Sequence, residues 1–189
     1  HQDGHSQLVA STVPNLRSYD PAFAYELAII IRDGIDRMYH RQDEIFYYIT
    51  IYNENYPMPE MPEGCEDGVI NGMYCFSKSA TPIKAKRKAH LFGSGSIMTE
   101  VLRAADILES NNIPTDIWSV TSYTQLSREA LQVERSNLLN PEKEDKATYV
   151  QNLLSGETGS FVAASDYMKA IPMSIEKWVP GTYTVLGTD

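Results

Sequence analysis

The chain has 189 residues, and its 25 acidic and 16 basic side chains give a formal net charge of −9. This charge argues against a general nucleic-acid-binding protein, which needs a basic face. No apolar run approaches the roughly 18–20 residues that span a bilayer, and no basic stretch precedes an apolar one as in a signal peptide. We therefore expect neither nucleic acid nor a membrane among its partners.

The first part of the chain reads as a helix followed by a strand. Apolar residues three and four apart predict a helix over residues 19–38, with Asp20 as its N-cap and Pro21 at the first helical position. Residues 45–52 are β-branched and aromatic throughout. Such a run without alternation predicts a strand buried on both faces, as in a parallel sheet.

The composition then changes sharply. Six proline and glycine residues lie between positions 57 and 72, which predicts a loop or linker with a short strand near residues 69–76. The basic cluster at residues 84–88 fits a solvated linker. We therefore divide the chain into residues 1–57, a linker over residues 58–87, and a second domain over residues 88–189.

Strands and helices alternate in the second domain. The pattern predicts strands at residues 89–92, 113–120, 161–164 and 183–186, and helices at residues 97–110, 125–139 and 167–178. Strands that alternate with helices of this length imply βαβ units. The sequence thus predicts an α/β fold with mainly parallel sheets and flanking helices.

One turn in this domain is a candidate anion site. Gly93, Ser94, Gly95 and Ser96 follow a strand and open a helix, where backbone N–H groups can face a phosphate. The turn lacks the third glycine of a dinucleotide fingerprint and the lysine of a P-loop. A tight structural turn is the favoured interpretation, and phosphate binding is the alternative.

Histidines and cysteines are the next candidates. His1 and His5 flank Asp3, but Gly4 disfavours the helix that a His-x3-His metal pair needs, and no further ligand is near in sequence. His40 and His90 are expected to be structural. The two cysteines, at positions 65 and 75, do not form a disulfide framework and are expected to be free thiols in a reducing cytoplasm.

A polar stretch at the end of the first strand is a further candidate. Residues 53–56 read Asn-Glu-Asn-Tyr, and ligands of α/β sheets bind at the carboxyl ends of strands. The stretch is either a ligand site or a loop or interface element. No Gly-x-Ser-x-Gly elbow is present, so a serine hydrolase is not indicated.

Several stretches together resemble one family. They read His-Gln-Asp-Gly-His-Ser (1–6), Ser-Tyr-Asp-Pro-Ala-Phe-Ala-Tyr-Glu (18–26), Asn-Glu-Asn-Tyr (53–56), Met-Pro-Glu-Met-Pro-Glu-Gly (58–64), Leu-Phe-Gly-Ser-Gly-Ser-Ile (91–97) and Leu-Gly-Thr-Asp (186–189). In this order and spacing they resemble the homodimeric bacterial type of pyruvate dehydrogenase E1 component. The resemblance covers essentially the whole chain.

The resemblance implies a transketolase-like fold and a position within a longer enzyme. Residues 1–57 would end the middle, pyrimidine-binding domain, and residues 88–189 would form an incomplete C-terminal domain. The intact cytoplasmic homodimer would decarboxylate pyruvate on thiamine diphosphate with Mg²⁺, and would transfer the acetyl group to the lipoyl domain of an E2 partner.

The resemblance also implies roles for the first residues. His5 would be the catalytic residue on the substrate side, with His1 and Asp3 as substrate-binding partners in the same loop. Histidine suits proton handling because its ordinary pKa lies near neutral pH. The wider transketolase family places its loop histidine nearer Gln7. The family's Gly-Asp-Gly cofactor motif and catalytic glutamate lie outside these residues, so the isolated chain is expected to be inactive.

Other functions stay open on the sequence. The chain could belong to another thiamine enzyme of the same fold, or it could serve as a non-catalytic dimerisation or assembly module. Exposed apolar surface would discriminate, because a fragment without its neighbouring domains should show a patch larger than the few hundred Å² typical of monomers. An anion-binding domain that uses the turn at residues 93–96 is a further alternative.

Overall fold

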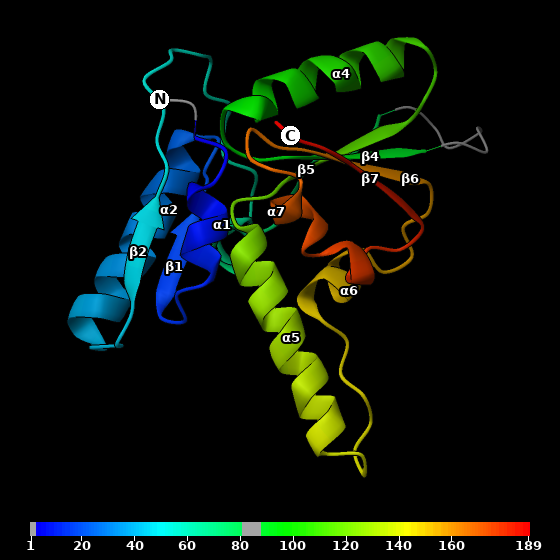
Figure 1. Ribbon diagram of the computed structural model, residues 1–189. Helices are drawn as coiled ribbons and strands as arrows, with labels where there is room; N and C mark the ends of the chain where they lie inside the picture. The colour runs from blue at the N-terminus through cyan, green and yellow to red at the C-terminus, as the bar shows by residue number, and fades with distance from the viewer. Residues whose placement is uncertain (1–2, 81–87) are drawn as a thin grey trace.

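The computed structural model describes residues 3–80 and 88–189. Its first part contains α1 (Ser6–Ser11), β1 (Leu16–Tyr19), α2 (Ala24–Ile35), the π-helical turn η1 (Asp36–His40) and β2 (Phe46–Ile49). β1 and β2 pair in parallel, and α1 and α2 lie beside them (Figure 1). Within the described ranges, no helix combines the length and the apolar character needed to cross a membrane.

Helix α2 begins later than the sequence pattern predicts. Its N-cap is Phe23, and the Glu26 side chain accepts hydrogen bonds from the backbone N–H groups of Ala22 and Phe23, at 2.6 and 3.1 Å. The prediction that Asp20 caps this helix was wrong. Asp20 follows β1 directly and is held by hydrogen bonds to the ends of other strands.

Strand β2 is shorter and less buried than predicted. It spans Phe46–Ile49, and none of its residues is fully buried. The prediction of a strand buried on both faces was wrong, because the residues of β2 are exposed or half-buried, and β1 is its sole partner strand among the described residues. The predicted parallel pairing is confirmed.

The proline- and glycine-rich stretch contains regular structure of its own. Helix α3 (Glu66–Asn71) and strand β3 (Tyr74–Ser77) fall between residues 58 and 80. Tyr74 and Val69 pack with Ile29 and Ile30 of α2. Residues 81–87, which include most of the basic cluster, lie outside the described residues.

The second sheet has five strands in the order β3-β5-β4-β6-β7. Besides β3, it comprises β4 (Ala89–Gly93), β5 (Thr115–Ser119), β6 (Ser160–Ala164) and β7 (Thr182–Leu186). β3 runs antiparallel to β5, and the other pairs are parallel. The predicted α/β fold with mainly parallel sheets is therefore confirmed.

Helices cover both faces of this sheet (Figure 1). The turn η2 (Gly95–Ile97) leads into α4 (Met98–Ser110), which packs on Leu91 and Ile117. The opposite face carries α5 (Tyr123–Leu139), α6 (Tyr149–Leu153), α7 (Ala170–Met173) and the turn η3 (Glu176–Trp178). Its core is built around Phe92, Trp118 and Phe161.

One predicted helix is broken. The sequence pattern predicts a helix over residues 167–178, but the structure has the short α7 followed by η3. Pro172 lies inside α7 and lacks the N–H group that a longer helix would use. Ser174 and Ile175 instead close shorter turns on Ile171 and Pro172.

Candidate functional site

The carboxyl ends of strands from both sheets meet at Asp20. This residue follows β1, and its backbone N–H donates to the Thr121 carbonyl beyond β5, at 2.8 Å. The Asp20 carbonyl accepts from the Gly95 N–H beyond β4, at 3.0 Å. Ligands of parallel sheets bind at such an edge. We therefore take the junction of the two sheets as the candidate functional site.

The Asp20 side chain is buried in this junction, with 6% of the residue exposed. One carboxyl oxygen, Oδ1, accepts hydrogen bonds from Thr50 Oγ1, at 2.6 Å, and from the Tyr52 hydroxyl. The other, Oδ2, has no hydrogen-bond partner among the described residues. Burial raises the pKa of Asp20, and the hydrogen bonds from Thr50 and Tyr52 oppose that rise.

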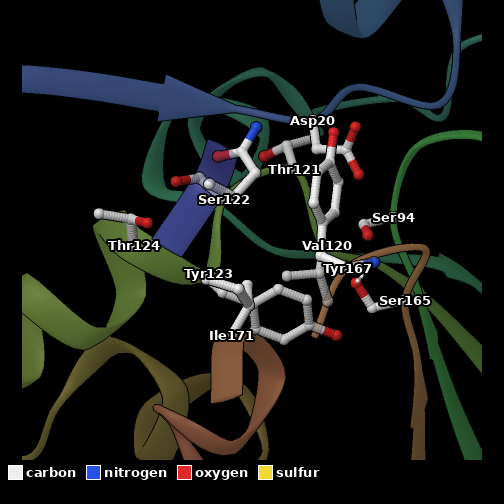
Figure 2. A pocket seen from close by; sticks show the side chains of 11 residues that line it. Asp20, Ser94, Val120, Thr121, Ser122, Tyr123, Thr124, Ser165, Tyr167 and Ile171 are labelled. Atoms are coloured by element: carbon white, nitrogen blue, oxygen red, sulfur yellow. Dashed lines mark hydrogen bonds between the residues drawn. The ribbon is translucent and has the colours of Figure 1, made fainter. Parts of the chain in front are cut away.

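A small cavity lies beside Asp20. Its volume is about 10 Å³, which holds about one water molecule. Figure 2 shows its lining, in which side chains from several strand ends converge. Besides Asp20 the lining residues are Gln7, Ser94, Val120, Thr121, Ser122, Tyr123, Thr124, Ser165, Tyr167 and Ile171.

The turn at residues 93–96 packs against acidic side chains of this chain. Gly95 has a φ of +49°, and a Cβ built there would lie 2.5 and 2.6 Å from the two carboxyl oxygens of Asp20. The Ser96 hydroxyl donates to Asp166. Two acidic groups therefore stand where a phosphate would bind, and the geometry matches the structural turn rather than an anion site.

The loop that carries His5 lies close to this junction. Asp3 Oδ1 accepts from the backbone N–H groups of the N-cap His5 and of Ser6, the first residue of α1, at 3.1 and 2.8 Å. Hydrogen bonds from Ser6 lower the pKa of Asp3. The Gly4 carbonyl accepts from the Met168 N–H, at 3.1 Å. The structure thus brings Asp3 and His5 together, both exposed, whereas His1 lies outside the described residues.

Gln7 connects this loop to the junction. Gln7 is buried, with 4% of the residue exposed. Its side-chain amide donates to the Tyr19 carbonyl, at 3.3 Å, and to Thr50 Oγ1, at 3.4 Å. Sequence reasoning missed Gln7, Thr50 and Tyr52 as members of one site. Two signals in the sequence could have identified them. Thr50 and Tyr52 follow the end of β2, and Gln7 lies four residues after Asp3.

The other polar candidates lie apart from the junction. Asn53, Glu54 and Asn55 are exposed, and the Tyr56 hydroxyl donates to the Ala22 carbonyl. His40 ends η1 at an exposed position. Both cysteines are free thiols in the structure, as expected.

A charged cluster lies at the opposite, amino end of the second sheet. His90, Asp116 and Glu157 each offer a ligand atom, and these atoms lie within 4.8 Å of one another. Lys78 and Lys88 fill this space, since both ammonium groups contact both carboxylates at 2.5–2.9 Å. Lys88 therefore belongs to an ion-pair network, not to a solvated linker as its sequence context suggested.

His90 is satisfied as a neutral side chain in that network. Its Nδ1 accepts from Trp118 Nε1, at 3.3 Å, and its Nε2 donates to the Thr158 carbonyl, at 3.2 Å. Burial lowers the pKa of His90. Both ring nitrogens are thus occupied, which fits a structural histidine and no metal ligand.

Neither the cavity at Asp20 nor the cluster at His90 fits thiamine diphosphate or Mg²⁺. The cavity at Asp20, about 10 Å³, is too small for a diphosphate. In the cluster at His90, the ammonium groups of Lys78 and Lys88 already occupy the place where a metal ion would bind. These two places therefore offer no set of ligand atoms for the cofactors that the resemblance implies.

The known proteins that resemble this chain align with it over its whole length. A family model of the pyruvate dehydrogenase E1 component middle domain matches residues 1–59, and one of the transketolase-like C-terminal domain matches residues 72–189, more than half of the chain. The Pseudomonas aeruginosa pyruvate dehydrogenase E1 component is 49% identical over 191 residues, and the Escherichia coli K12 one 44% identical over 192. Both alignments cover 100% of this chain and 21% of the relative.

Solved structures show the same fold at low identity. A transketolase from Pichia stipitis has a TM-score of 0.65 at 13% identity, over 100% of this chain and 23% of its own. A transketolase from Campylobacter jejuni has a TM-score of 0.61 at 18% identity, over 96% of this chain and 23% of its own. The chain spans about a fifth of the curated relatives that it matches. It belongs to the transketolase-like family, and its homologues at 43–49% identity are pyruvate dehydrogenase E1 components.

Proposed function

We propose that this chain forms one wall of the active site of a thiamine-diphosphate-dependent pyruvate dehydrogenase E1 component. The observation that carries the proposal is the 44–49% identity to such components over the whole chain. The exposed His5 loop beside the carboxyl ends of the strands is consistent with it. The thiamine cofactor would supply decarboxylation chemistry from elsewhere in the enzyme.

His5 is the residue of this wall that we assign to the substrate, with His1 and Asp3 beside it. Its imidazole is exposed, and Asp3 orients its backbone through the cap of α1. An imidazole near neutral pH can accept and donate a proton, which contributes about 10²- to 10⁴-fold to a rate. Its task would be to bind pyruvate and move protons on the substrate side.

The same proposal gives the partners of the whole enzyme. Pyruvate would be the substrate, and the lipoyl domain of an E2 acetyltransferase would take the acetyl group. The enzyme would act as a cytoplasmic homodimer and use Mg²⁺ with its cofactor.

The test is a histidine substitution in the full-length enzyme. His5→Gln is expected to lower kcat/KM for pyruvate by about 10²- to 10⁴-fold. His40→Gln is the matched control, because His40 is an exposed histidine in η1. Wild-type kcat/KM in the His5→Gln enzyme would refute the assignment. Calorimetry with thiamine diphosphate and Mg²⁺ should show binding by the full-length enzyme and none by this chain alone.

An assembly role is a second candidate, favoured by exposed apolar side chains near β2 and η1. Tyr39, Phe46 and Ile51 have exposed fractions of 78%, 45% and 70%. Large apolar side chains that are exposed in an isolated chain can contact a partner surface in the assembled protein. Substitution of Phe46 and Ile51 by serine should then weaken oligomerisation in sedimentation velocity, whereas His5→Gln should not.

A further inference from the structure

We propose that Asp20 and Thr50 are positioning residues that hold α1, the helix that follows His5, and that they act through Gln7. This inference rests on the proposed function, because it gives His5 a role toward the substrate. Three parts of the chain that are distant in sequence meet here: α1, the end of β1 and the end of β2.

The first step is the contact between Asp20 and Thr50. Asp20 is fixed by its backbone hydrogen bonds to Thr121 and Gly95, so its carboxyl group has a defined place. Thr50 Oγ1 donates to Asp20 Oδ1 over 2.6 Å, and the Tyr52 hydroxyl donates to the same oxygen. Thr50 is thus oriented by a buried acceptor, and movement of that acceptor would break the backbone hydrogen bonds of Asp20 to Thr121 and Gly95.

The second step runs from Thr50 to α1. Once its proton points to Asp20, the Thr50 oxygen is free to accept, and Gln7 Nε2 lies 3.4 Å away. The same amide donates to the Tyr19 carbonyl, at 3.3 Å. Gln7 is two residues after His5 on the first turn of α1. The polar chain Asp20–Thr50–Gln7 therefore sets the rotation and depth of the helix that begins at His5.

The third step fixes the loop from its other side. Tyr167 lines the same cavity as Asp20, and the next residue, Met168, donates its N–H to the Gly4 carbonyl. His5 is thereby held between Gly4 and Gln7, both anchored at the junction. Geometry of this kind matters because a misplacement of about 1 Å can cost about 100-fold in rate.

A second buried acid provides the matched control. Glu26 is 0% exposed and also joins the two parts of the chain, since it accepts from Tyr74 of β3 and Ser119 of β5, at 2.7 and 2.5 Å. It has no contact with α1 among its hydrogen bonds to described residues. Loss of Glu26 should weaken the fold and leave the His5 loop in place.

The experiment uses the full-length enzyme with Thr50→Val, Thr50→Ser and Glu26→Gln. Thr50→Val removes the hydroxyl and keeps the shape, and we expect kcat/KM for pyruvate to fall about 10- to 100-fold. Thr50→Ser restores the hydroxyl and should retain the wild-type value. Glu26→Gln should lower the Tm while kcat/KM stays at the wild-type level. Amide exchange of residues 6–11 should accelerate in Thr50→Val and not in Glu26→Gln.

A double variant separates positioning from general damage. If Thr50 acts through His5, then Thr50→Val combined with His5→Gln should be no slower than His5→Gln alone, because effects within one unit are not additive. Additive losses, or unchanged amide exchange in α1, would overturn the inference. A wild-type rate for His5→Gln would instead refute the proposed function, and the exchange measurement would still test the Asp20–Thr50–Gln7 link.

Discussion

Replacement of Gly95 by alanine should destabilise the chain more than its backbone conformation alone explains. Gly95 has a φ of +49°, and its Cα lies under the buried carboxyl group of Asp20. The left-handed conformation costs a residue with a Cβ about 1–2 kcal/mol. An added methyl group would lie 2.5 and 2.6 Å from the carboxyl oxygens and 2.3 Å from the Tyr52 hydroxyl, so the carboxyl group must move.

The size of the effect follows from the contacts that would break. Asp20 accepts hydrogen bonds from Thr50 and Tyr52 in a buried site, and a buried donor or acceptor that loses its partner costs about 1–3 kcal/mol. Loss of one such bond plus the backbone cost gives about 2–5 kcal/mol. Gly156→Ala is the control, because Gly156 also has a positive φ, +78°, and open space around its Cα. It should cost about 1–2 kcal/mol.

Urea unfolding followed by tryptophan fluorescence measures both variants. Trp118 and Trp178 are buried in the core of the second sheet, so their emission reports its unfolding. Gly95→Ala is therefore expected to lose at least about 1 kcal/mol more than Gly156→Ala. Equal losses in the two variants would show that the carboxyl group of Asp20 is not packed against Gly95, and would remove the basis for its fixed position.

Two further predictions concern groups away from the junction. Burial opposes the shift, but hydrogen bonds from Lys88 and Lys78 hold the pKa of Asp116 below its ordinary 3.8. The ionised carboxylate therefore contributes its full stabilisation above that pH, and this stabilisation is lost as the pH falls below it. In Asp116→Asn, the free energy of unfolding measured in urea should fall less steeply between about pH 5 and pH 2 than in the wild type. Burial raises the pKa of the Cys65 thiol, and the thiolate is the form that reacts with iodoacetamide. Iodoacetamide should therefore modify Cys65 only as fast as the chain unfolds. Rapid alkylation of Cys65 in the folded protein would contradict this expectation.

The second sheet was largely predictable because its signals are local. Residues 89–92 and 161–164 are short apolar runs between turn residues, and each became a strand, β4 and β6. The broken helix at α7 was missed because the apolar spacing outweighed Pro172 in the pattern. Strand β1 had no signal of its own: its four residues read Leu-Arg-Ser-Tyr, and pairing with β2 makes them a strand.

The site was less predictable because its contacts are long-range. The resemblance singled out Asp3 and His5, which lie together at the start of α1. Asp20 looks like a helix cap next to Pro21, since the sequence does not reveal that Thr121 and Gly95 would bind its backbone. Gln7 likewise has its partner at Thr50, 43 residues away. Such roles depend on which strand ends meet, and local patterns carry no information on that.

Buried acids hold the two parts of this chain together, and their chemistry explains why they suit the task. Apolar contacts such as Phe23 on Phe76 allow small sliding movements. Glu26 of α2 accepts four hydrogen bonds, two from the backbone just before its own helix and one each from β3 and β5, so a shift would leave buried donors unpaired. Asp20 adds the same constraint at the strand ends, through its hydrogen bonds from Thr50 and Tyr52. Directional polar contacts therefore define the place where the His5 loop docks, while the apolar core supplies the stability that permits them.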